Sequence, residues 1–263
     1  DEVNSSIVID GILKEECWND INKLTVDGSY IDNFTQVIPN NLLAPSFKTV
    51  VSIVADLENI YIAARLFDSN PDSITQRLSR RDDIDPWLSD WFSIELDSNH
   101  DHDSAYRFVV NASGVQLDGI IYGDLEFDLG YNAIWESDVQ IDEYGWKLEM
   151  KIPFKMLSIT EIKNPWGMNI SRFISRYSER NRWIVFPRGT PGVVSQFGHL
   201  FGFKEMKIKR GIEFKPYFLS GHDRYNNSYL VDPERFSDSH FEYADDTLST
   251  NIGVDIKYRL SQS

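Results

Sequence analysis

Hydrophobic and polar residues alternate with a period of two in many short segments of this chain. The segment 91–97, WFSIELD, is typical, because phenylalanine, isoleucine and leucine occupy every second position. A period of two places alternate side chains on opposite faces of a β-strand. Turn-forming residues separate the segments, and no long stretch has the three-to-four-residue period of an amphipathic helix. The pattern predicts an all-β fold, an antiparallel β-sandwich of the jelly-roll or immunoglobulin-like type.

Two pairs of segments have the form of β-hairpins. Residues 49–56 and 59–68 are rich in β-branched and aromatic residues and flank a short turn. Residues 137–141 and 145–153 flank a second turn, and the later segment alternates cleanly. Before them, Trp18 follows a short strand and a turn. We expect Trp18 to anchor the core, because large aromatic side chains mostly serve packing.

The chain is expected to contain two parts. The alternating segments of the sandwich end near residue 205, which predicts a first domain over 1–205. Residues 211–222 and 251–260 alternate again on either side of a polar segment. Two strands do not form a stable domain alone, and their pattern is also that of membrane-barrel strands. We predict that 206–263 is a hairpin-like tail that starts a truncated β-barrel region; an accessory hairpin on the sandwich is the alternative.

Composition argues against several classes of partner. The formal net charge of −15 disfavours nucleic acid and anionic lipid, because both attract a basic surface. Cys17 is the only cysteine, so no disulfide forms within the chain. No apolar run is long enough for a transmembrane helix. The start at Asp1 is compatible with removal of a signal peptide.

No constellation of residues predicts catalysis. A glycoside hydrolase requires two carboxylates about 5 to 10 Å apart in a cleft, and no spacing in this sequence singles out such a pair. The sequence also lacks a nucleophile elbow, a phosphate-binding glycine loop and a zinc signature. The chain is therefore predicted to be noncatalytic. The carboxylates considered are Asp90, Glu95, Asp118, Asp124 and Glu126.

The polar segment 97–104 has oxygen-bearing side chains at alternate positions. Such oxygens are the ligands that calcium prefers, although the glycine and the distal glutamate of an EF-hand are missing. His100 and His102 flank the same tip, where a transition metal would need a third ligand. A solvated hairpin tip is the alternative interpretation. The candidate metal ligands are Asp97, Asn99, Asp101 and Asp103.

Several motifs, in their order along the chain, resemble carbohydrate-binding module family 9 over residues 7–205. The resemblance implies a jelly-roll β-sandwich that binds sugar without catalysis and requires no cofactor; the family is also known to bind structural calcium. The motifs are Asp10-Gly11-x-Leu13-x-Glu15-x-x-Trp18, Ala63-Ala64-Arg65-x-Phe67-Asp68, Asp90-Trp91 with Leu96-Asp97, Gly145-Trp146-x-x-Glu149, Ile152-Pro153-Phe154 and Phe197-Gly198.

The resemblance also implies a binding site. In the family two tryptophans sandwich a terminal sugar ring, and by motif position these fall on Trp87 and Trp183. Sugar C–H groups form an apolar patch that stacks on aromatic faces, and hydrogen bonds to the hydroxyl groups set specificity. Ser93 and Val109 stand where the family has a glutamate and an arginine. The polar candidates for carbohydrate binding are Arg107, Asn111, Arg172 and Arg180.

The whole chain resembles more closely an uncharacterised bacterial family in which a family-9-like domain precedes a predicted outer-membrane β-barrel. This resemblance implies an exported protein on the periplasmic or cell-surface side of the outer membrane. Its partners would be the end of an oligo- or polysaccharide, captured during polysaccharide utilisation, and the covalently continuous barrel. Two alternatives stay open: a structural or partner-docking domain of the barrel protein without sugar binding, or part of a polysaccharide-degrading hydrolase.

Overall fold

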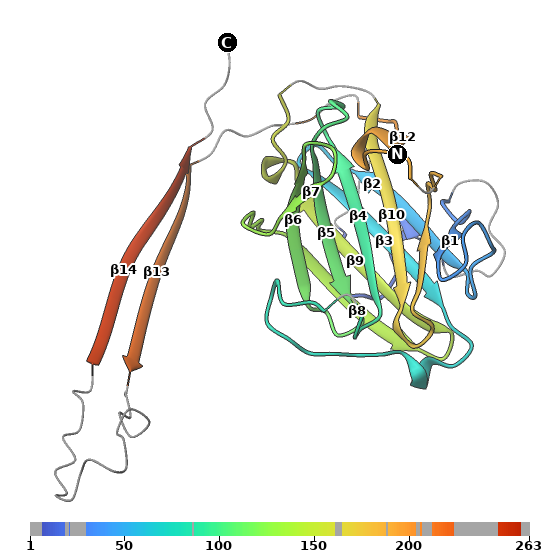
Figure 1. The fold of residues 1–263 in the computed structure, drawn as a ribbon, viewed down its shortest axis with the longest axis horizontal. Helices are drawn as coiled ribbons and strands as arrows, with labels where there is room; N and C mark the ends of the chain where they lie inside the picture. The colour runs from blue at the N-terminus through green and yellow to red at the C-terminus, as the bar shows by residue number, and fades with distance from the viewer. Residues whose placement is uncertain are drawn as a thin grey trace, which may run out of the picture. The chain divides into compact units, whose positions relative to one another are not determined.

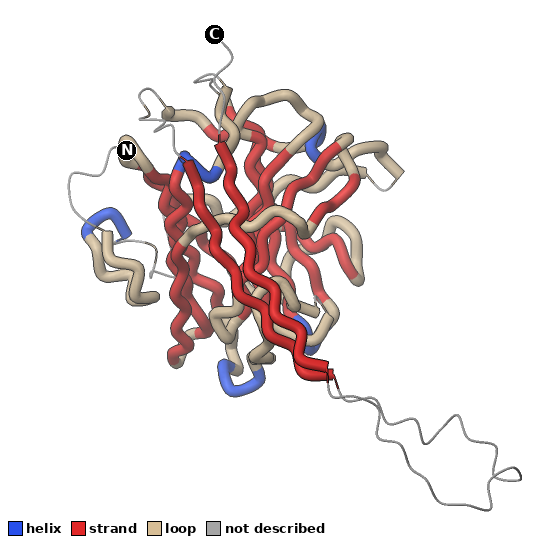
Figure 2. The backbone as a smooth tube through the Cα atoms, turned by 90° about the vertical axis from the view of Figure 1, so that its left-hand side faces the viewer, coloured by secondary structure: helices blue, strands red, loops and turns tan. Residues whose placement is uncertain are grey.

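The computed structural model describes residues 7–18, 21, 30–85, 87–160, 165–187, 189–203, 206, 212–223 and 247–258. The chain divides into two compact units, residues 1–209 and 210–263. The first unit is a sandwich of two antiparallel β-sheets, drawn as a ribbon in Figure 1 and as a backbone tube in Figure 2. The predicted all-β sandwich is confirmed, and the helices described in this unit are single 3₁₀ turns.

The larger sheet has eight strands and the smaller sheet has four. The order in the larger sheet is β1 (Thr35–Ile38), β11 (Glu179–Arg182), β10 (Trp166–Ile174), β4 (Trp91–Asp97), β5 (Ala105–Asn111), β6 (Gln116–Tyr122) and β7 (Glu126–Asp128), and β12 (Gly198–Leu200) pairs with the start of β10. The order in the smaller sheet is β2 (Thr49–Ala55), β3 (Asn59–Phe67), β9 (Gly145–Pro153) and β8 (Glu136–Asp142). The 3₁₀ turns are η1 (Glu16–Trp18), η2 (Pro71–Ser73), η3 (Phe154–Met156), η4 (Ser175–Tyr177) and η5 (Val194–Gln196).

The main core lies between the two sheets and follows from the alternation within each strand. In β4, Phe92, Ile94 and Leu96 are fully buried in this layer, together with Trp146 of β9 and Trp166 of β10. Burial of one large apolar side chain stabilises the fold by about 1.5–3 kcal/mol. The two predicted hairpins correspond to β2–β3 and β8–β9.

The outer face of the smaller sheet is covered by the N-terminal segment. Trp18, at the end of η1, is fully buried as predicted and belongs with Leu13 to a cluster that includes residues of β2 and β3. Its indole Nε1 donates a hydrogen bond to Glu149 Oε1 at 2.9 Å. The N–H groups of Asp10 and Gly11 donate to Oε2 of the same carboxylate. One buried carboxylate of β9 therefore fastens the N-terminal segment to the sheet.

The second unit contains the strands β13 (Ile212–Asp223) and β14 (Thr247–Tyr258), which pair antiparallel along their whole length. The predicted strand segments 211–222 and 251–260 overlap these two strands. The register pairs apolar positions with each other, for example Phe214 with Ile256 and Phe218 with Ile252. Within the described parts of the chain, no helix is both long and apolar enough to cross a bilayer.

Candidate functional site

A group of polar side chains lies at the centre of the outer face of the larger sheet. Ser93 and Glu95 of β4 alternate with core residues and therefore lie on the face away from the core. Arg107 of β5 pairs with Glu95 in the strand register. Arg180 and Arg182 of β11 fall on the same face, because they are in register with the outward positions of β10 and β4. We call these five residues the central cluster.

Glu95 is the negative group of the central cluster. Its Oε1 accepts a hydrogen bond from Ser93 Oγ at 3.0 Å and lies 3.2 Å from Nε of Arg107. Glu95 is 7% exposed. A carboxylate that is largely removed from water requires such partners, because desolvation of a charge is costly. Glu95 and Arg107 therefore form a largely buried ion pair on the outer face of the larger sheet.

Arg180 and Arg182 bring two further positive charges close to this pair. Burial lowers the pKa of Arg180 to about 10, with the nearby charges of Arg182 and Arg107 acting in the same direction. Burial also lowers the pKa of Arg182, and Glu95 partly opposes this effect. Both groups stay protonated at neutral pH. The structure thus holds three guanidinium groups beside one carboxylate.

Aromatic rings line one end of the central cluster. Trp91 is buried and stacks on Phe173 with ring centroids 5.5 Å apart. The guanidinium carbons of Arg107 and Arg180 lie 5.8 and 5.5 Å from the centroid of the Trp91 ring, within the range of cation–π contacts. Trp87, in the loop before β4, is 51% exposed and meets Phe173 edge to face at 5.3 Å. The exposed Trp87 ring therefore lies beside the charged central cluster.

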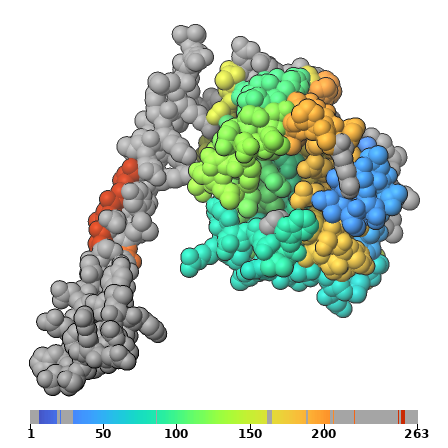
Figure 3. All heavy atoms as spheres, viewed as in Figure 1, coloured from blue at the N-terminus to red at the C-terminus, as the bar shows by residue number. Residues whose placement is uncertain are grey.

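Figure 3 shows this face in space-filling form. The surface is hollowed between the green residues of the β6–β7 side and the orange residues near β12. Phe127 of β7 is 38% exposed at this side, and its ring lies 5.3 Å from the guanidinium carbon of Arg107. A concave surface with a few convergent polar groups and apolar ring faces is the usual form of a small-ligand site.

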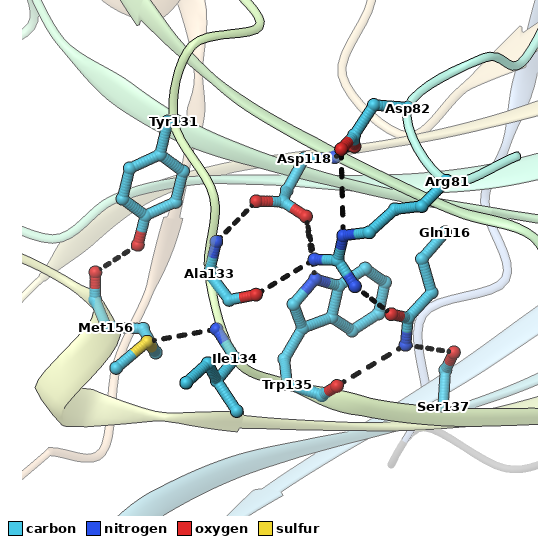
Figure 4. Close-up of polar contacts among 10 residues, drawn as sticks. All are labelled: Arg81, Asp82, Gln116, Asp118, Tyr131, Ala133, Ile134, Trp135, Ser137 and Met156. Atoms are coloured by element: carbon cyan, nitrogen blue, oxygen red, sulfur yellow. Dashed lines mark hydrogen bonds and ion pairs between the residues drawn. The ribbon is translucent and has the colours of Figure 1, made fainter. Parts of the chain in front are cut away.

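The loop that carries Trp87 is tied to the sandwich by a polar network (Figure 4). Arg81 forms an ion pair with the buried Asp118 of β6 and donates to the carbonyl of Ala133 at 2.9 Å. Asp118 also accepts hydrogen bonds from the N–H of Ala133 and from Nε1 of Trp135. Closer to the site, Ser175 Oγ donates to the carbonyl of Trp87 at 2.9 Å. The loop that carries the exposed Trp87 ring is thus held to the sandwich by hydrogen bonds and an ion pair.

The structure does not bring Trp183 next to Trp87. The Trp183 ring packs against the main core and lies over Gly198 of β12, where an added Cβ would come within 2.9 Å of it. β12 pairs with the start of β10, whereas Phe173, the contact of Trp87, is near the end of β10. The N–H of Trp183 donates to the carbonyl of Ile170, three residues before Phe173, so at about 3.3 Å per residue the two tryptophans attach about 10 Å apart along this strand. The two rings pack on different residues, Trp183 over Gly198 and Trp87 against Phe173.

Two of the predicted polar residues form internal hydrogen bonds. Asn111 lies on the outer face, but its amide donates to the carbonyl of Arg77 and its Oδ1 accepts from the N–H groups of Ser113 and Val115. Arg172 lies on the core face of β10 and is fully buried. Of the predicted site residues, the structure therefore gathers Trp87, Arg107 and Arg180 at the central cluster.

Sequence reasoning missed Arg182, and it named Glu95 only as a candidate catalytic carboxylate. No strand was predicted at the position of β11, which extends through Arg182. The alternation of Arg180 and Arg182 on either side of a buried Asn181 was the available signal, since it is the period of a strand with one charged face.

Two of the candidate calcium ligands at the β4–β5 tip bond to their own loop, whereas Asn99 bonds to Ser158 and Thr160. Asp97 accepts hydrogen bonds from the N–H groups of Asp101 and His102, and Asp101 accepts from Asp103 and Ser104. In the described part of the chain, no three His, Cys, Asp or Glu side chains are arranged to hold a metal ion. Calcium at Asp97, Asn99, Asp101 and Asp103 stays a prediction.

The tip also gathers histidines from two parts of the chain. The rings of His100 and His102 are 4.3 Å apart, and His199 of β12 lies 5.2 Å from His100. The third ring was not apparent in the sequence, because it arrives through the pairing of β12 with β10.

Four of the five acidic residues considered for catalysis form hydrogen bonds or ion pairs within the chain. Asp90 accepts a hydrogen bond from the N–H of Ser175 and is fully buried, so burial raises its pKa. Asp124 binds the segment before β12 through Val193 and Ser195. Together with the bonds of Asp118 and Glu95, these contacts account for four of the five carboxylates.

Comparisons with known proteins bear on the fold. No family model matches this sequence, and no curated protein matches it. A family 9 carbohydrate-binding module (CBM9) from Caldicellulosiruptor kristjanssonii in complex with cellotriose has a TM-score of 0.51 and 14% identity, covering 75% of this chain and 89% of that chain. The structure of a CBM9 from the same organism in complex with glucose has a TM-score of 0.52 and 16% identity, covering 75% and 91%. The likeness shows a family-9-like β-sandwich fold.

Proposed function

We propose that residues 1–209 form a noncatalytic carbohydrate-binding module that holds the end of a glycan on the outer face of the larger sheet. The observation that carries the proposal is an exposed Trp87 ring beside the central cluster. The fold is similar to that of modules in complex with cellotriose and glucose, which supports the same class of ligand.

In this proposal each group has a defined task. The Trp87 ring stacks on the C–H face of a terminal sugar ring. Arg107, Arg180 and Arg182 donate hydrogen bonds to its oxygen atoms, and Glu95 accepts from a hydroxyl group. Asn111 and Arg172 hold the turn and the strand on which these groups stand. Trp183 fills the edge of the core, and the sugar contacts one exposed tryptophan.

The test is a titration of the full chain with glucose, cellotriose and a panel of other sugars, followed by tryptophan fluorescence and calorimetry. We expect saturable binding that is lost in Trp87→Ala. Tyr144→Ala is the matched control, because Tyr144 is a similarly exposed ring in the β8–β9 turn. Equal affinity of the two variants would place the ligand elsewhere, and reducing-sugar release by the purified protein would contradict a noncatalytic module.

The two long strands of the second unit, β13 and β14, support a proposal about the cellular location of the module. β13 and β14 contain twelve residues each, enough for a membrane-spanning strand of about 9–11 residues. Ile252 and Val254 occupy alternate positions of β14, and both are exposed. We propose that 206–263 begins an outer-membrane barrel, so that the module is exported and acts on the periplasmic or cell-surface side.

The alternative role of a docking domain uses the same second unit. In that case the sandwich binds another envelope protein and no sugar. Protease treatment of intact and permeabilised cells that express the full coding sequence would place the sandwich on one side of the membrane. A blank sugar panel together with recovery of one specific partner from envelope extract would select the docking role.

A further inference from the structure

We propose that the sugar bound at the central cluster carries a carboxylate, and that the ligand is a terminal uronic acid. The inference rests on the proposed function, because it names the ligand class of the same site. The observation behind it is a local excess of positive charge in the central cluster of an acidic protein. The cluster contains three arginines and one glutamate, whereas the whole chain has a net charge of −15.

The only carboxylate of the cluster is already engaged. Glu95 pairs with Arg107 and accepts a hydrogen bond from Ser93. Among the described residues, no carboxylate forms an ion pair with Arg180 or Arg182. Their Nε atoms are buried without a hydrogen-bond partner, as are those of Arg65, Arg107 and Arg172. Glu95 acts on these two guanidinium groups only as a nearby charge, so in the described chain both Arg180 and Arg182 lack a carboxylate within ion-pair distance.

Other largely buried arginines of the described chain contact either a carboxylate or several hydrogen-bond acceptors. Arg65 pairs with Asp142 at 2.6 Å, and Arg176 pairs with Asp68 at 2.7 Å. Arg172, the most buried of them, donates to two backbone carbonyls and one hydroxyl group. Because burial of an unpaired charge is costly, the exception at Arg180 and Arg182 points to an anion supplied from outside.

The electrostatics of the cluster agree with this geometry. Burial and the neighbouring arginines lower the pKa of Arg180 to about 10, so the three charges repel each other while staying protonated at neutral pH. A bound anion would relieve that repulsion. The guanidinium groups of Arg180 and Arg182 would gain from the ligand a direct ion pair like the one that Glu95 forms with Arg107.

The chemistry of the neighbours selects a carboxylate on a sugar ring. The guanidinium group is planar and binds a carboxylate through two parallel hydrogen bonds. Trp87 and Phe127, both exposed beside the cluster, offer apolar ring faces that a free inorganic anion would not use. A uronic acid presents both a C–H face and a planar carboxylate, so it matches both parts of the surface.

The experiment compares dissociation constants of the full chain for glucuronic acid, glucose, the methyl ester of glucuronic acid, glucose 6-sulfate and acetate. We expect glucuronic acid to bind about tenfold or more tightly than glucose and the uncharged ester. We also expect added salt to weaken this preference.

Amino-acid substitutions test whether the preference for glucuronic acid over glucose depends on the central cluster. Arg182→Gln is expected to reduce the ratio of glucuronic acid to glucose affinity to about one, and Arg182→Lys to leave an intermediate ratio because ammonium lacks the planar geometry of guanidinium. Lys155→Gln, which removes one charge from an exposed position of η3, is expected to keep the full ratio. Near-ultraviolet circular dichroism checks that each variant is folded.

The outcomes separate this inference from the proposed function. Equal affinity for glucose and glucuronic acid would overturn the inference and leave the carbohydrate-binding proposal standing. If acetate bound as tightly as glucuronic acid, the ligand would be a simple anion and the inference would be wrong. If glucose 6-sulfate bound more tightly than glucuronic acid, the ligand would be a sulfated sugar and the inference would also be wrong. A preference unchanged in Arg182→Gln would also overturn it, and the absence of binding by any sugar would overturn both proposals.

Discussion

Arg172 is a fully buried charge whose hydrogen bonds join the two sheets. Its guanidinium donates to the carbonyls of Lys48 and Phe67 at 3.1 and 2.9 Å and to Thr49 Oγ1 at 3.1 Å. Burial lowers its pKa to about 10, so the side chain keeps its charge at neutral pH. The same residue type therefore serves the scaffold on the core face of β10 and the central cluster on the outer face of β11.

We predict that Arg172→Leu destabilises the sandwich by about 2–4 kcal/mol, because it removes three hydrogen bonds that join the two sheets inside the protein. Urea unfolding of the full chain, followed by tryptophan fluorescence, measures the change. Lys155→Leu is the exposed control and should alter the midpoint little. A midpoint for Arg172→Leu equal to that of the wild type would contradict the structural role of these hydrogen bonds.

At the scale of elements, the N-terminal segment makes one face of the sandwich different from the other. This segment covers the outer face of the smaller sheet through Trp18 and its neighbours and is held by Glu149. Burial raises the pKa of Glu149, and the hydrogen bonds from the segment oppose that effect. The larger sheet instead keeps an exposed Trp87 and a half-buried charged cluster on its outer face.

Glu149→Gln is predicted to loosen the N-terminal segment, because an amide offers one oxygen where the carboxylate accepts from three donors. The expected cost is about 1–3 kcal/mol. Hydrogen exchange should increase in residues 7–18 and stay unchanged in β4 and β5. Asp138→Asn, at the exposed register partner of Glu149 on β8, is the control. Unchanged protection of residues 7–18 in Glu149→Gln would count against this fastening role.

The segment before β12 is held by Asp124, and this contact has a defined pH dependence. Burial acts to raise the pKa of Asp124, but hydrogen bonds from Ser195 and Val193 outweigh burial and lower it. A lowered pKa in the folded state means that the ionised carboxylate stabilises the fold above the ordinary aspartate pKa of about 3.9. That stabilisation is lost as the pH falls through the folded-state pKa.

We therefore predict that Asp124→Asn lowers the urea midpoint at about pH 7 and changes it less at about pH 3. Asp72→Asn, at an exposed position of η2, should show no such difference between the two conditions. An equal loss of stability at both pH values would show that the charge of Asp124 does not contribute.

On the scale of the whole molecule, the two units have separate sets of internal contacts. The first unit has a core between its two sheets and a further cluster under its N-terminal segment. The second unit is one pair of strands, and two strands alone are at best marginally stable in water. The stability of the sandwich should thus be independent of 210–263.

Removal of 210–263 is predicted to leave the urea midpoint and the sugar affinity of the sandwich unchanged, because its core lies within residues 1–209. Unfolding of the truncated and the full chain under identical conditions measures this. A large fall in the midpoint on truncation would show that the second unit stabilises the first.

Part of the site was predictable because it depends on local pattern. The alternation of 91–97 placed Ser93 and Glu95 on one face of a strand, and the loop before it contained the exposed Trp87. Arg107 and Asn111 are four positions apart in β5, so the same alternation places both on its outer face. Arg182 was missed because a four-residue strand with charged positions has too little hydrophobic pattern to be distinguished from a loop.

The sequence by itself determined that this chain forms short antiparallel strands with two distinct faces and a core that includes Trp18, because a period of two and large aromatic residues act through local geometry and burial. The tertiary structure alone decided which face each arginine occupies. Arg172 and Arg180 are eight positions apart in the sequence, but the register of β10 with β11 turns one toward the core and the other toward the surface. It also separated Trp183 from Trp87, because partners distant in the chain fix strand register and no local pattern specifies them.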